Sequence, residues 1–346
     1  MTSQGRHILS PALDSWLVGG GSLLVLSLLA AIGFFVSPDL VLQNFLVLTV
    51  LFNGTHFLAS YRLLYSSRDF ALSYPWASVY MPAILIAYSA WAIAMHIYNP
   101  AVTWPVPVLT GAAAVYLALH YTGQAWGMMA SFAYLDGVRF KPSDKRVLRF
   151  CLRIMAAWHM LWAMRLLWKP EPAVEGYVEA ASIGMNVLGL LSFVVGLVCL
   201  SSVGRSEGHR VTGRVVLPYI ALHVWYAFLY VFPAAIFWVQ IAHALQYLPF
   251  PLRVELNRSS TLSSSKSAAR VALSYGLVLA ICSALLFGLV PHIAERMGVG
   301  AQSVWVVIAS VINIHHYFID GCIWHISNPV VSKELFAHTA QSRVTQ

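Results

Sequence analysis

The sequence predicts an all-α, polytopic transmembrane helical bundle, and its composition carries that prediction. Of 346 residues, 59% are hydrophobic and only 10% are charged, and the mean hydropathy is +0.71. A soluble domain needs roughly 25–35% charged residues on its surface, and a disordered chain is poor in hydrophobic residues. Both classes are therefore excluded. The four cysteines lie in apolar stretches without a C-x-x-C pair, so we expect small buried hydrophobes rather than disulfides.

About ten stretches are long enough to span a bilayer, because a spanning helix needs about 20 mostly apolar residues. Pro233 lies in the middle of the longest apolar run, 215–247, and a proline there breaks or kinks a helix. The run is too long for one ordinary span and short for two, so one kinked span, two passes and a re-entrant pair buried by neighbouring helices all stay open. We count it as two passes because the loop charges favour an even number of spans. The ten predicted spans are 16–35, 42–61, 77–98, 106–129, 147–168, 180–200, 215–232, 234–247, 268–290 and 303–326.

Loop charges predict the orientation of these spans. Cytoplasmic loops of membrane proteins are enriched in Lys and Arg, and an even number of spans puts most basic loops on the side of the N-terminus. Both termini are then cytoplasmic, as expected for a multi-pass protein of a bacterial inner membrane. The net charge of +8 follows from these loops and indicates no nucleic-acid partner. We expect a single transmembrane domain, 1–346, with a polar N-terminal tail 1–15, cytoplasmic loops 136–146 and 253–267, and a polar C-terminal tail 327–346.

Histidines are the unusual polar residues of the predicted spans. Ionisable side chains inside a bilayer are costly and mark functional sites. Counting along each helix at about 1.5 Å per residue places seven histidines at a similar depth, in the cytoplasmic half of the bundle. A common depth on separate helices is what a shared metal site requires. The predicted metal ligands are His56, His120, His159, His223, His243, His315, His316 and the one carboxylate well inside a span, Asp320.

Polar neighbours at helical spacing support the metal prediction. Asn313 and Asp320 lie at i−3 and i+4 from His316, which places them on one helix face. A metal-bound imidazole usually donates its other N–H to such a partner. We therefore expect Gln124, Gln246 and Asn313 to orient the bound cofactor. The predicted catalytic groups are Asp320, as a base, and Tyr317, as a proton or electron donor. Tyr247 is a further candidate for the donor role.

The ligand types indicate the chemistry. Imidazole suits Zn, Cu, Fe and Ni, and a histidine–carboxylate set with open positions suits non-haem iron. The predicted set exceeds the needs of one metal and fits either two metals in one cavity or one metal whose ligands are supported by the remaining residues. Two iron ions are the expectation, with copper or haem b as alternatives. The substrate within reach of a bilayer site is a lipid, an isoprenoid or another hydrocarbon. The predicted function is a membrane-embedded oxidoreductase that uses O₂, with the lipid bilayer, a hydrophobic substrate and an electron-donor protein as partners.

Helix-borne histidines at the cytoplasmic side carry a resemblance in composition and placement. They resemble those of the integral-membrane non-haem iron oxygenases, both the desaturases and hydroxylases and the bacterial carotene-cleaving enzymes. The segments His120-Tyr-Thr-Gly-Gln124, His243-Ala-Leu-Gln-Tyr247 and His315-His-Tyr-Phe-Ile-Asp-Gly321 look like marks of a bacterial membrane family without an assigned function. The desaturases carry H-x-x-x-H and H-x-x-H-H boxes, and this chain has neither, only the pair His315-His316. The resemblance implies iron held by histidines from separate helices and oxidation of a hydrocarbon chain.

Three other function classes stay open. Two mid-span histidines are enough to ligate haem b in an electron carrier. Asp320 and the histidines also suit a relay in a transporter of metal ions or protons, although no internal repeat is visible. In the third class, the histidines are structural contacts in an assembly subunit. Metal analysis together with an absorption spectrum separates these classes.

Overall fold

The computed structural model describes residues 7–35, 45–99, 101–168, 170–206, 211–261, 267–298, 300–324 and 329–339. Every regular element in these residues is helical, which confirms the all-α prediction. Eight described helices are long and apolar enough to cross a membrane, as expected of a multi-pass membrane protein. They are Pro11–Ile32, Trp76–Tyr98, Pro105–Asp136, Pro142–Leu167, Pro172–Ser206, Gly213–Val231, Ala268–Arg296 and Ser303–Ile323.

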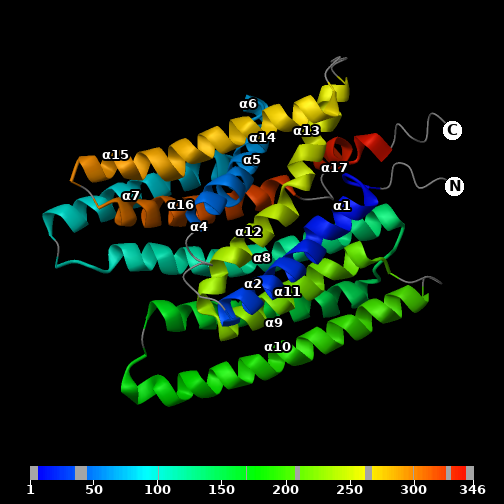
Figure 1. The fold of residues 1–346 in the computed structure, drawn as a ribbon, viewed down its shortest axis with the longest axis horizontal. Helices are drawn as coiled ribbons and strands as arrows, with labels where there is room; N and C mark the ends of the chain where they lie inside the picture. Colours follow the sequence, from blue (N-terminus) through cyan, green and yellow to red (C-terminus); the bar gives the residue numbers. More distant parts are fainter. Residues whose placement is uncertain are drawn as a thin grey trace. The chain divides into compact units, whose positions relative to one another are not determined.

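The other two expected spans differ from these eight. The stretch 42–61 begins on residues outside the described part of the chain, and 234–247 holds a shorter helix. Pro233 does break the apolar run 215–247: one helix ends at Val231, Phe232 is extended, and the chain reverses (Figure 1). The residue before a proline is disfavoured in the helical region, which explains the position of the break.

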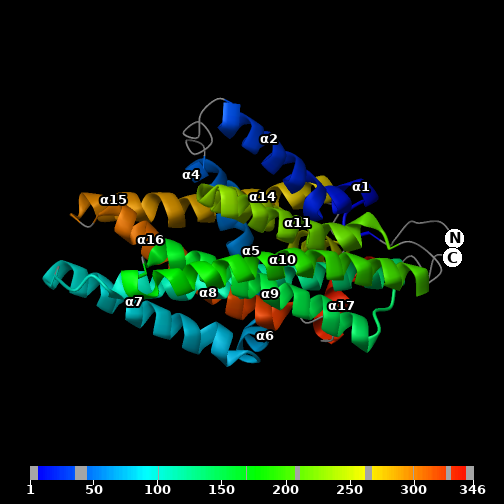
Figure 2. The same cartoon turned by 90° about the horizontal axis from the view of Figure 1, so that it is seen from below.

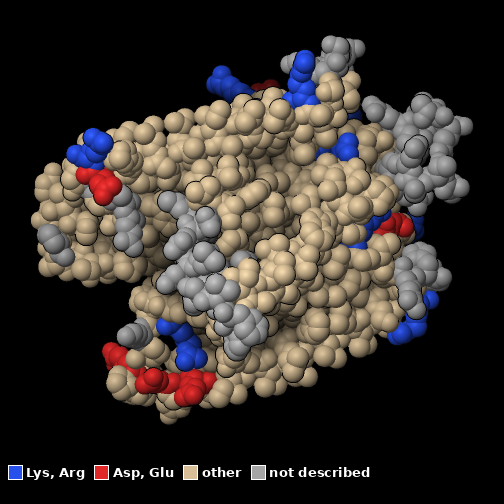
Figure 3. Space-filling model, in the orientation of Figure 1, with Lys and Arg blue, Asp and Glu red and all other residues tan. Residues whose placement is uncertain are grey.

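The chain divides into two compact units. The first unit contains Met1–Phe45 and Ala118–Gln246, and the second contains Leu46–Leu117 and Tyr247–Gln346. The face drawn in Figure 3 is mostly uncharged, with Lys, Arg, Asp and Glu mainly at its margins. Such a surface suits hydrocarbon, where a charged side chain is costly.

The first unit is built on α9 and α10, which lie side by side and antiparallel (Figure 1). Helix α11 packs against α10 at Gly196, where an added Cβ would overlap the Tyr219 ring. Glycine thus permits the close approach of these two helices. The elements of this unit are α1 (Pro11–Ser15), η1 (Trp16–Gly20), α2 (Gly21–Phe35), the second half of α8 (Pro105–Asp136), α9 (Pro142–Leu167), α10 (Pro172–Ser206), α11 (Gly213–Val231), η4 (Pro233–Ala235) and α12 (Ile236–Tyr247).

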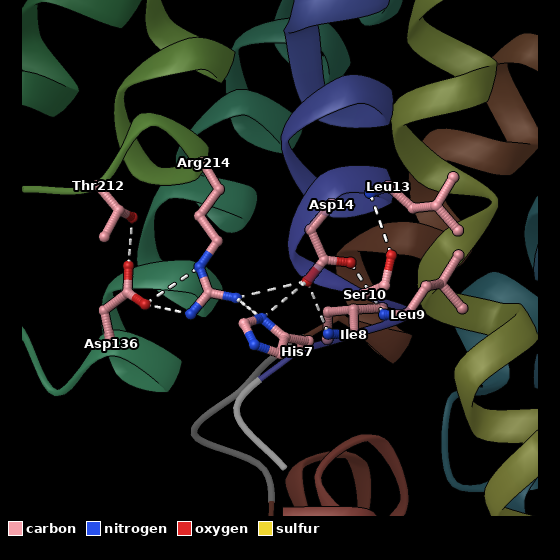
Figure 4. A network of polar contacts seen from close by, with 9 residues as sticks. All are labelled: His7, Ile8, Leu9, Ser10, Leu13, Asp14, Asp136, Thr212 and Arg214. Atoms are coloured by element: carbon pink, nitrogen blue, oxygen red, sulfur yellow. Dashed lines mark hydrogen bonds and ion pairs between the residues drawn. The ribbon is translucent and has the colours of Figure 1, made fainter. Parts of the chain in front are cut away.

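A buried ion-pair network fastens the N-terminal segment to this unit (Figure 4). Arg214 at the start of α11 pairs with Asp136 and, at 3.5 Å, with Asp14. Asp14 also accepts hydrogen bonds from the backbone N–H groups of Ile8 and Leu9, each at 2.9 Å. The charge of the buried guanidinium is therefore balanced by carboxylates, which a buried charge requires.

The second unit is centred on α16, which packs against α5, α7 and the π-helical segment η3. Helix α14, η5 and α15 form one continuous run beside it (Figure 2). The elements of this unit are α4 (Phe45–Leu48), η2 (Thr49–Gly54), α5 (Thr55–Leu64), α6 (Arg68–Leu72), η3 (Trp76–Tyr80), α7 (Met81–Tyr98), the first part of α8, α13 (Pro249–Thr261), α14 (Ala268–Ala284), η5 (Leu285–Leu289), α15 (Val290–Arg296), α16 (Ala301–Ile323) and α17 (Pro329–Leu335).

Segments expected as loops or tails contain helix. In the expected loop 253–267, α13 continues to Thr261, while 262–266 lie outside the described residues. The reason is tertiary: Asn257 Nδ2 donates to the carbonyl oxygens of Glu334 (2.7 Å) and Leu335 (3.2 Å), and these bonds hold a polar helix in place. The expected loop 136–146 and tails 1–15 and 327–346 likewise contain the start of α9, helix α1 and helix α17.

The four cysteines are free, as expected. Cys151 is buried, but Cys282 is exposed on α14, so the expectation of burial is wrong for Cys282. An exposed apolar side chain on a membrane-spanning helix faces lipid at no cost, because lipid tails are themselves apolar.

Candidate metal centre

In the second unit, His56 on α5 and His316 on α16 lie face to edge. Their ring centroids are 4.3 Å apart at an interplanar angle of 80°, and both side chains are buried. His56 follows directly after η2, and π-helical segments occur frequently at functional sites. Gly54 ends η2 against Ser283 of α14, where an added Cβ would overlap the serine hydroxyl. The close packing of η2 on α14 thus sets the position of His56.

The protonation pattern of His56 follows from its backbone partner. Its Nδ1 lies 3.3 Å from the carbonyl oxygen of Asn53. Because a carbonyl oxygen can only accept a hydrogen bond, Nδ1 carries the proton. The lone pair is then on Nε2, and this is the arrangement of a metal-binding imidazole.

His316 has a carboxylate partner in place of a carbonyl. Its Nε2 lies 3.4 Å from Oδ2 of Asp320, one helical turn further along α16. Asp320 Oδ1 in turn accepts hydrogen bonds from the hydroxyl groups of Tyr247 (3.0 Å) and Ser60 (3.1 Å). Trp324 Nε1 donates to the Tyr247 oxygen at 2.8 Å. With a proton on Nε2 facing Asp320, the lone pair of the His316 ring is on Nδ1.

In the first unit, His120 on α8 and His243 on α12 form a second pair. Their ring centroids are 4.7 Å apart, again at 80°, and both side chains are buried. Gln124 Nε2 donates to the backbone carbonyl oxygen of His243 at 3.1 Å, so this predicted site residue joins α8 to α12. The ring of Tyr121 lies 4.4 Å from that of His243. An aromatic ring is therefore the close neighbour of this pair.

These four buried histidines form a cluster that is compatible with metal binding. One ring nitrogen from each of His56, His120, His243 and His316 lies within 4.8 Å of the other three. Metal–imidazole bonds are about 2.0–2.1 Å long, so ligands on opposite sides of an ion are about 4 Å apart. The spacing of the four nitrogens is thus close to what one ion needs.

The structure gives His315 a different role. Its Nε2 lies 2.6 Å from the carbonyl oxygen of Ala77, and its Nδ1 lies 2.7 Å from the hydroxyl of Tyr61. The carbonyl must accept from Nε2, so Nδ1 accepts from Tyr61 and no lone pair is left for a metal. Although adjacent in sequence to His316, His315 fastens α16 to η3 and α5.

His159 and His223 lie in the first unit, apart from the four-histidine cluster. Both ring nitrogens of His223 are in hydrogen-bond contact, with the carbonyl oxygen of Tyr219 (2.9 Å) and with Ser192 Oγ (3.0 Å). His159 is surrounded by the rings of Tyr121, Tyr226 and Trp162.

The remaining predicted site residues have structural contacts. Gln246 Nε2 donates to the carbonyl oxygen of Val18 in η1 at 2.6 Å. Asn313 Nδ2 donates to the carbonyl oxygen of Ala309 in its own helix at 2.7 Å. Tyr317 packs on the ring of Tyr116.

Sequence reasoning did not single out Trp324 or Tyr61. Trp324 donates Nε1 to Tyr247, 77 residues away in sequence, and Tyr61 reaches His315 across 254 residues. Neither contact has a local signal, because these partners become neighbours only through folding. Comparison of the chain with protein families, curated proteins and solved structures finds no match.

Proposed function

We propose that this chain is a membrane metalloenzyme in which His56, His120, His243 and His316 hold one redox-active ion, with iron as the proposed metal. The proposed reaction is O₂-dependent oxidation of a hydrophobic molecule taken from the bilayer, with electrons from a separate donor protein. The bacterial inner membrane is the proposed location. The observation that carries the proposal is the grouping of four buried histidine nitrogens within 4.8 Å.

The cluster supports one ion in place of the two expected from the sequence. Four imidazoles are enough for one ion and leave positions open for O₂ or substrate, as non-haem iron requires. An iron ion would supply the one-electron chemistry that O₂ activation needs, which protein side chains alone do not provide. The chain itself orients the ligands and keeps water out, since the four histidines are buried.

The ligand environment supports a permanent site rather than four structural histidines. Asn53 and Asp320 each bind the non-ligating nitrogen of a histidine, which fixes both tautomer and ring orientation. Ser60 and Tyr247 hold Asp320 in place by hydrogen bonds. These residues therefore maintain the donor set before a metal enters.

Haem b fits the cluster poorly. The porphyrin supplies four ligands in the plane of the iron, so at most two histidines bind. Four imidazole nitrogens within 4.8 Å of one another would occupy the space of the ring. A Soret band is therefore not expected.

Metal analysis and an absorption spectrum of the purified protein test the proposal. We expect a single iron per chain and no Soret band, with metal lost in His316→Ala. His315→Gln is the matched control, because His315 is the neighbouring buried histidine and a glutamine side chain also offers a donor and an acceptor. A Soret band would favour the haem carrier, and metal-free protein would favour a transporter or an assembly subunit; both results contradict the proposal.

The reaction is tested with isotopically labelled oxygen. Iron-containing protein in bilayer discs made from bacterial lipid extract is supplied with ¹⁸O₂ and an excess of a chemical reductant in place of the donor protein, and the lipids are analysed by mass spectrometry. We expect ¹⁸O-labelled lipid or isoprenoid products, absent with His316→Ala. Iron binding without any oxygen consumption would contradict the oxidase part of the proposal and leave the metal site intact.

A further inference from the structure

A cluster of aromatic side chains lies beside the histidine pair of the first unit. Tyr121 links the two, because its ring is 4.4 Å from that of His243 and 5.9 Å from that of His159. The ring of His159 is in turn 5.2 Å from that of Tyr226. We call this group the aromatic cluster; it comprises Tyr121, Trp158, His159, Trp162, Trp225 and Tyr226.

The tryptophan N–H groups of the aromatic cluster all have partners. Trp158 Nε1 donates to Oδ1 of Asn186 at 2.7 Å. Trp162 Nε1 donates to the carbonyl oxygen of Leu229 at 3.2 Å, and Trp225 Nε1 donates to the hydroxyl of Ser22 at 3.1 Å. The fold therefore satisfies the indole donors of this region, as buried polar groups normally require.

Three other polar atoms of the same cluster have no hydrogen-bond partner among the described residues. They are the hydroxyl groups of Tyr121 and Tyr226 and the Nδ1 atom of His159. The exposed fractions of these residues are 2%, 1% and 1%, so bulk water does not reach them. A buried polar atom without a partner is costly, and three such atoms on rings that contact one another through His159 indicate a ligand that supplies the partner.

The donor set indicates the chemistry of that ligand. Two phenol O–H groups can both donate to one oxygen atom, since a carbonyl or hydroxyl oxygen has two lone pairs. The surrounding rings are apolar and suit a hydrocarbon body. We propose that Tyr121, Tyr226 and His159 bind the carbonyl or hydroxyl oxygen of a hydrophobic substrate. This inference deepens the proposed function and rests on it for the reaction, because Tyr121 also contacts His243.

Tyr219 provides a matched control. It lies on α11, the helix of Tyr226, and is equally buried, but its hydroxyl donates to the carbonyl oxygen of Ser192 at 2.5 Å. Tyr219→Phe therefore removes a hydroxyl group that has a hydrogen-bond partner. Tyr121→Phe and Tyr226→Phe each remove a hydroxyl group that has none among the described residues. The two kinds of variant have opposite expected effects on the ligand-free protein.

Infrared spectroscopy tests ligand binding directly. The as-purified protein in bilayer discs is mixed with a long-chain methyl ketone labelled with carbon-13 at the carbonyl. We expect a bound carbonyl band at lower frequency than for the ketone in empty discs. Tyr121→Phe and Tyr226→Phe should each reduce the shift, Tyr121→Phe/Tyr226→Phe should abolish it, and Tyr219→Phe should retain it. An unshifted band in the wild-type protein overturns the inference.

Thermal unfolding without ketone distinguishes a substrate site from a site filled by a permanent water. In a ligand site, Tyr121→Phe and Tyr226→Phe leave Tm unchanged or higher, while Tyr219→Phe lowers it. With a permanent water, both variants lower Tm as Tyr219→Phe does, and that result overturns the inference.

Metal content measured on the same samples separates the two proposals. If the purified protein contains no metal but binds the ketone, the proposed function is contradicted and this inference is not. If the protein contains metal but does not shift the ketone carbonyl band, this inference is contradicted and the proposed function is not.

Discussion

The two histidine pairs have nearly the same geometry and different surroundings. The ring centroids are 4.7 Å apart in the His120–His243 pair and 4.3 Å apart in the His56–His316 pair, both at 80°. In the second unit, the ring of His56 contacts the carbonyl oxygen of Asn53, and the ring of His316 contacts the carboxylate of Asp320. In the first unit, the ring of Tyr121 packs against His243. Aromatic rings pack against both pairs, since the ring of Tyr247 lies 4.8 Å from that of His56. The comparison teaches that the second pair combines aromatic packing with a carboxylate partner on its own helix, Asp320.

This difference gives the two pairs different chemical tasks. A carboxylate behind an imidazole increases its basicity and fixes its orientation, so in the proposed site the second unit would tune the metal. The first unit offers aromatic walls and partnerless hydroxyl groups, which suit the binding of a hydrophobic molecule. We expect polar substitutions near His316 to change metal affinity, and aromatic substitutions near His243 to change substrate binding.

The largest expected effect is the loss of one ligand from either pair. His120→Ala and His316→Ala should each weaken metal binding by more than the roughly 10–100-fold that follows loss of a supporting residue. Titration with a competing chelator measures this affinity. Equal losses support a shared ion, whereas full metal retention in His120→Ala would restrict the site to the second unit. His223→Gln serves as the control in the first unit.

The next effect is on stability, and it contrasts the ion pairs of the two units. Arg214 is buried between Asp136 and Asp14, so Arg214→Met leaves two buried carboxylates without a cation. Breaking a buried pair in this way costs about 3–5 kcal/mol. Thermal unfolding should show a large decrease in Tm. An unchanged Tm would mean that the network of Figure 4 does not hold the N-terminal segment.

Asp320→Asn tests the polar support of the second pair. The variant keeps the shape of the side chain and removes its charge, so we expect a loss of about 10–100-fold in metal affinity. Asn313→Ala on the same helix is the control, because Asn313 Nδ2 donates to the carbonyl oxygen of Ala309 within its own helix. Equal affinities of Asp320→Asn and the wild type would show that Asp320 does not support His316.

Two glycine substitutions compare the close helix contacts of the units. The methyl group added by Gly54→Ala would overlap the side chain of Ser283, and that added by Gly196→Ala would overlap the side chain of Tyr219. Overpacking of this kind costs about 1–3 kcal/mol, so both variants should unfold at lower temperature. Because η2 positions His56, only Gly54→Ala should also lose metal, as measured by elemental analysis. Metal loss in Gly196→Ala as well would mean that general destabilisation, and not the position of His56, releases the ion.

The smallest expected effect is at the exposed ion pair of the second unit. Arg258 and Glu334 are 2.7 Å apart, with side chains 31% and 38% exposed. Solvent screening limits such a pair to about 0–1 kcal/mol. Arg258→Ala should therefore change Tm only slightly, in contrast to Arg214→Met. A Tm decrease as large as that of Arg214→Met would show that α13 and α17 depend on this pair.

The fold was predictable where local chemistry decides it. Apolar length predicted the spanning helices, and Pro233 predicted the break between α11 and α12. The segment 253–261 was not predictable, because its polar composition is typical of a loop. Bonds from Asn257 to carbonyl oxygens of Glu334 and Leu335, far along the chain, hold it as a helix.

The grouping of histidines was predictable from sequence, but the details of the candidate site were not. Counting residues placed the histidines at a common level, and four of them do come together. Sequence could not distinguish His315 from His316, because the difference lies in Tyr61 and Ala77, which occupy both nitrogens of His315. The partnerless hydroxyl groups of Tyr121 and Tyr226 also had no sequence signal, since a missing partner is a property of the folded protein.

X-ray absorption at the metal edge of the purified protein tests the central claim most directly. The account predicts a shell of nitrogen ligands at about 2.0–2.1 Å, with imidazole scattering that weakens in His316→Ala and is unchanged in His315→Gln. A porphyrin signature, or a metal shell without imidazole, would contradict the four-histidine site.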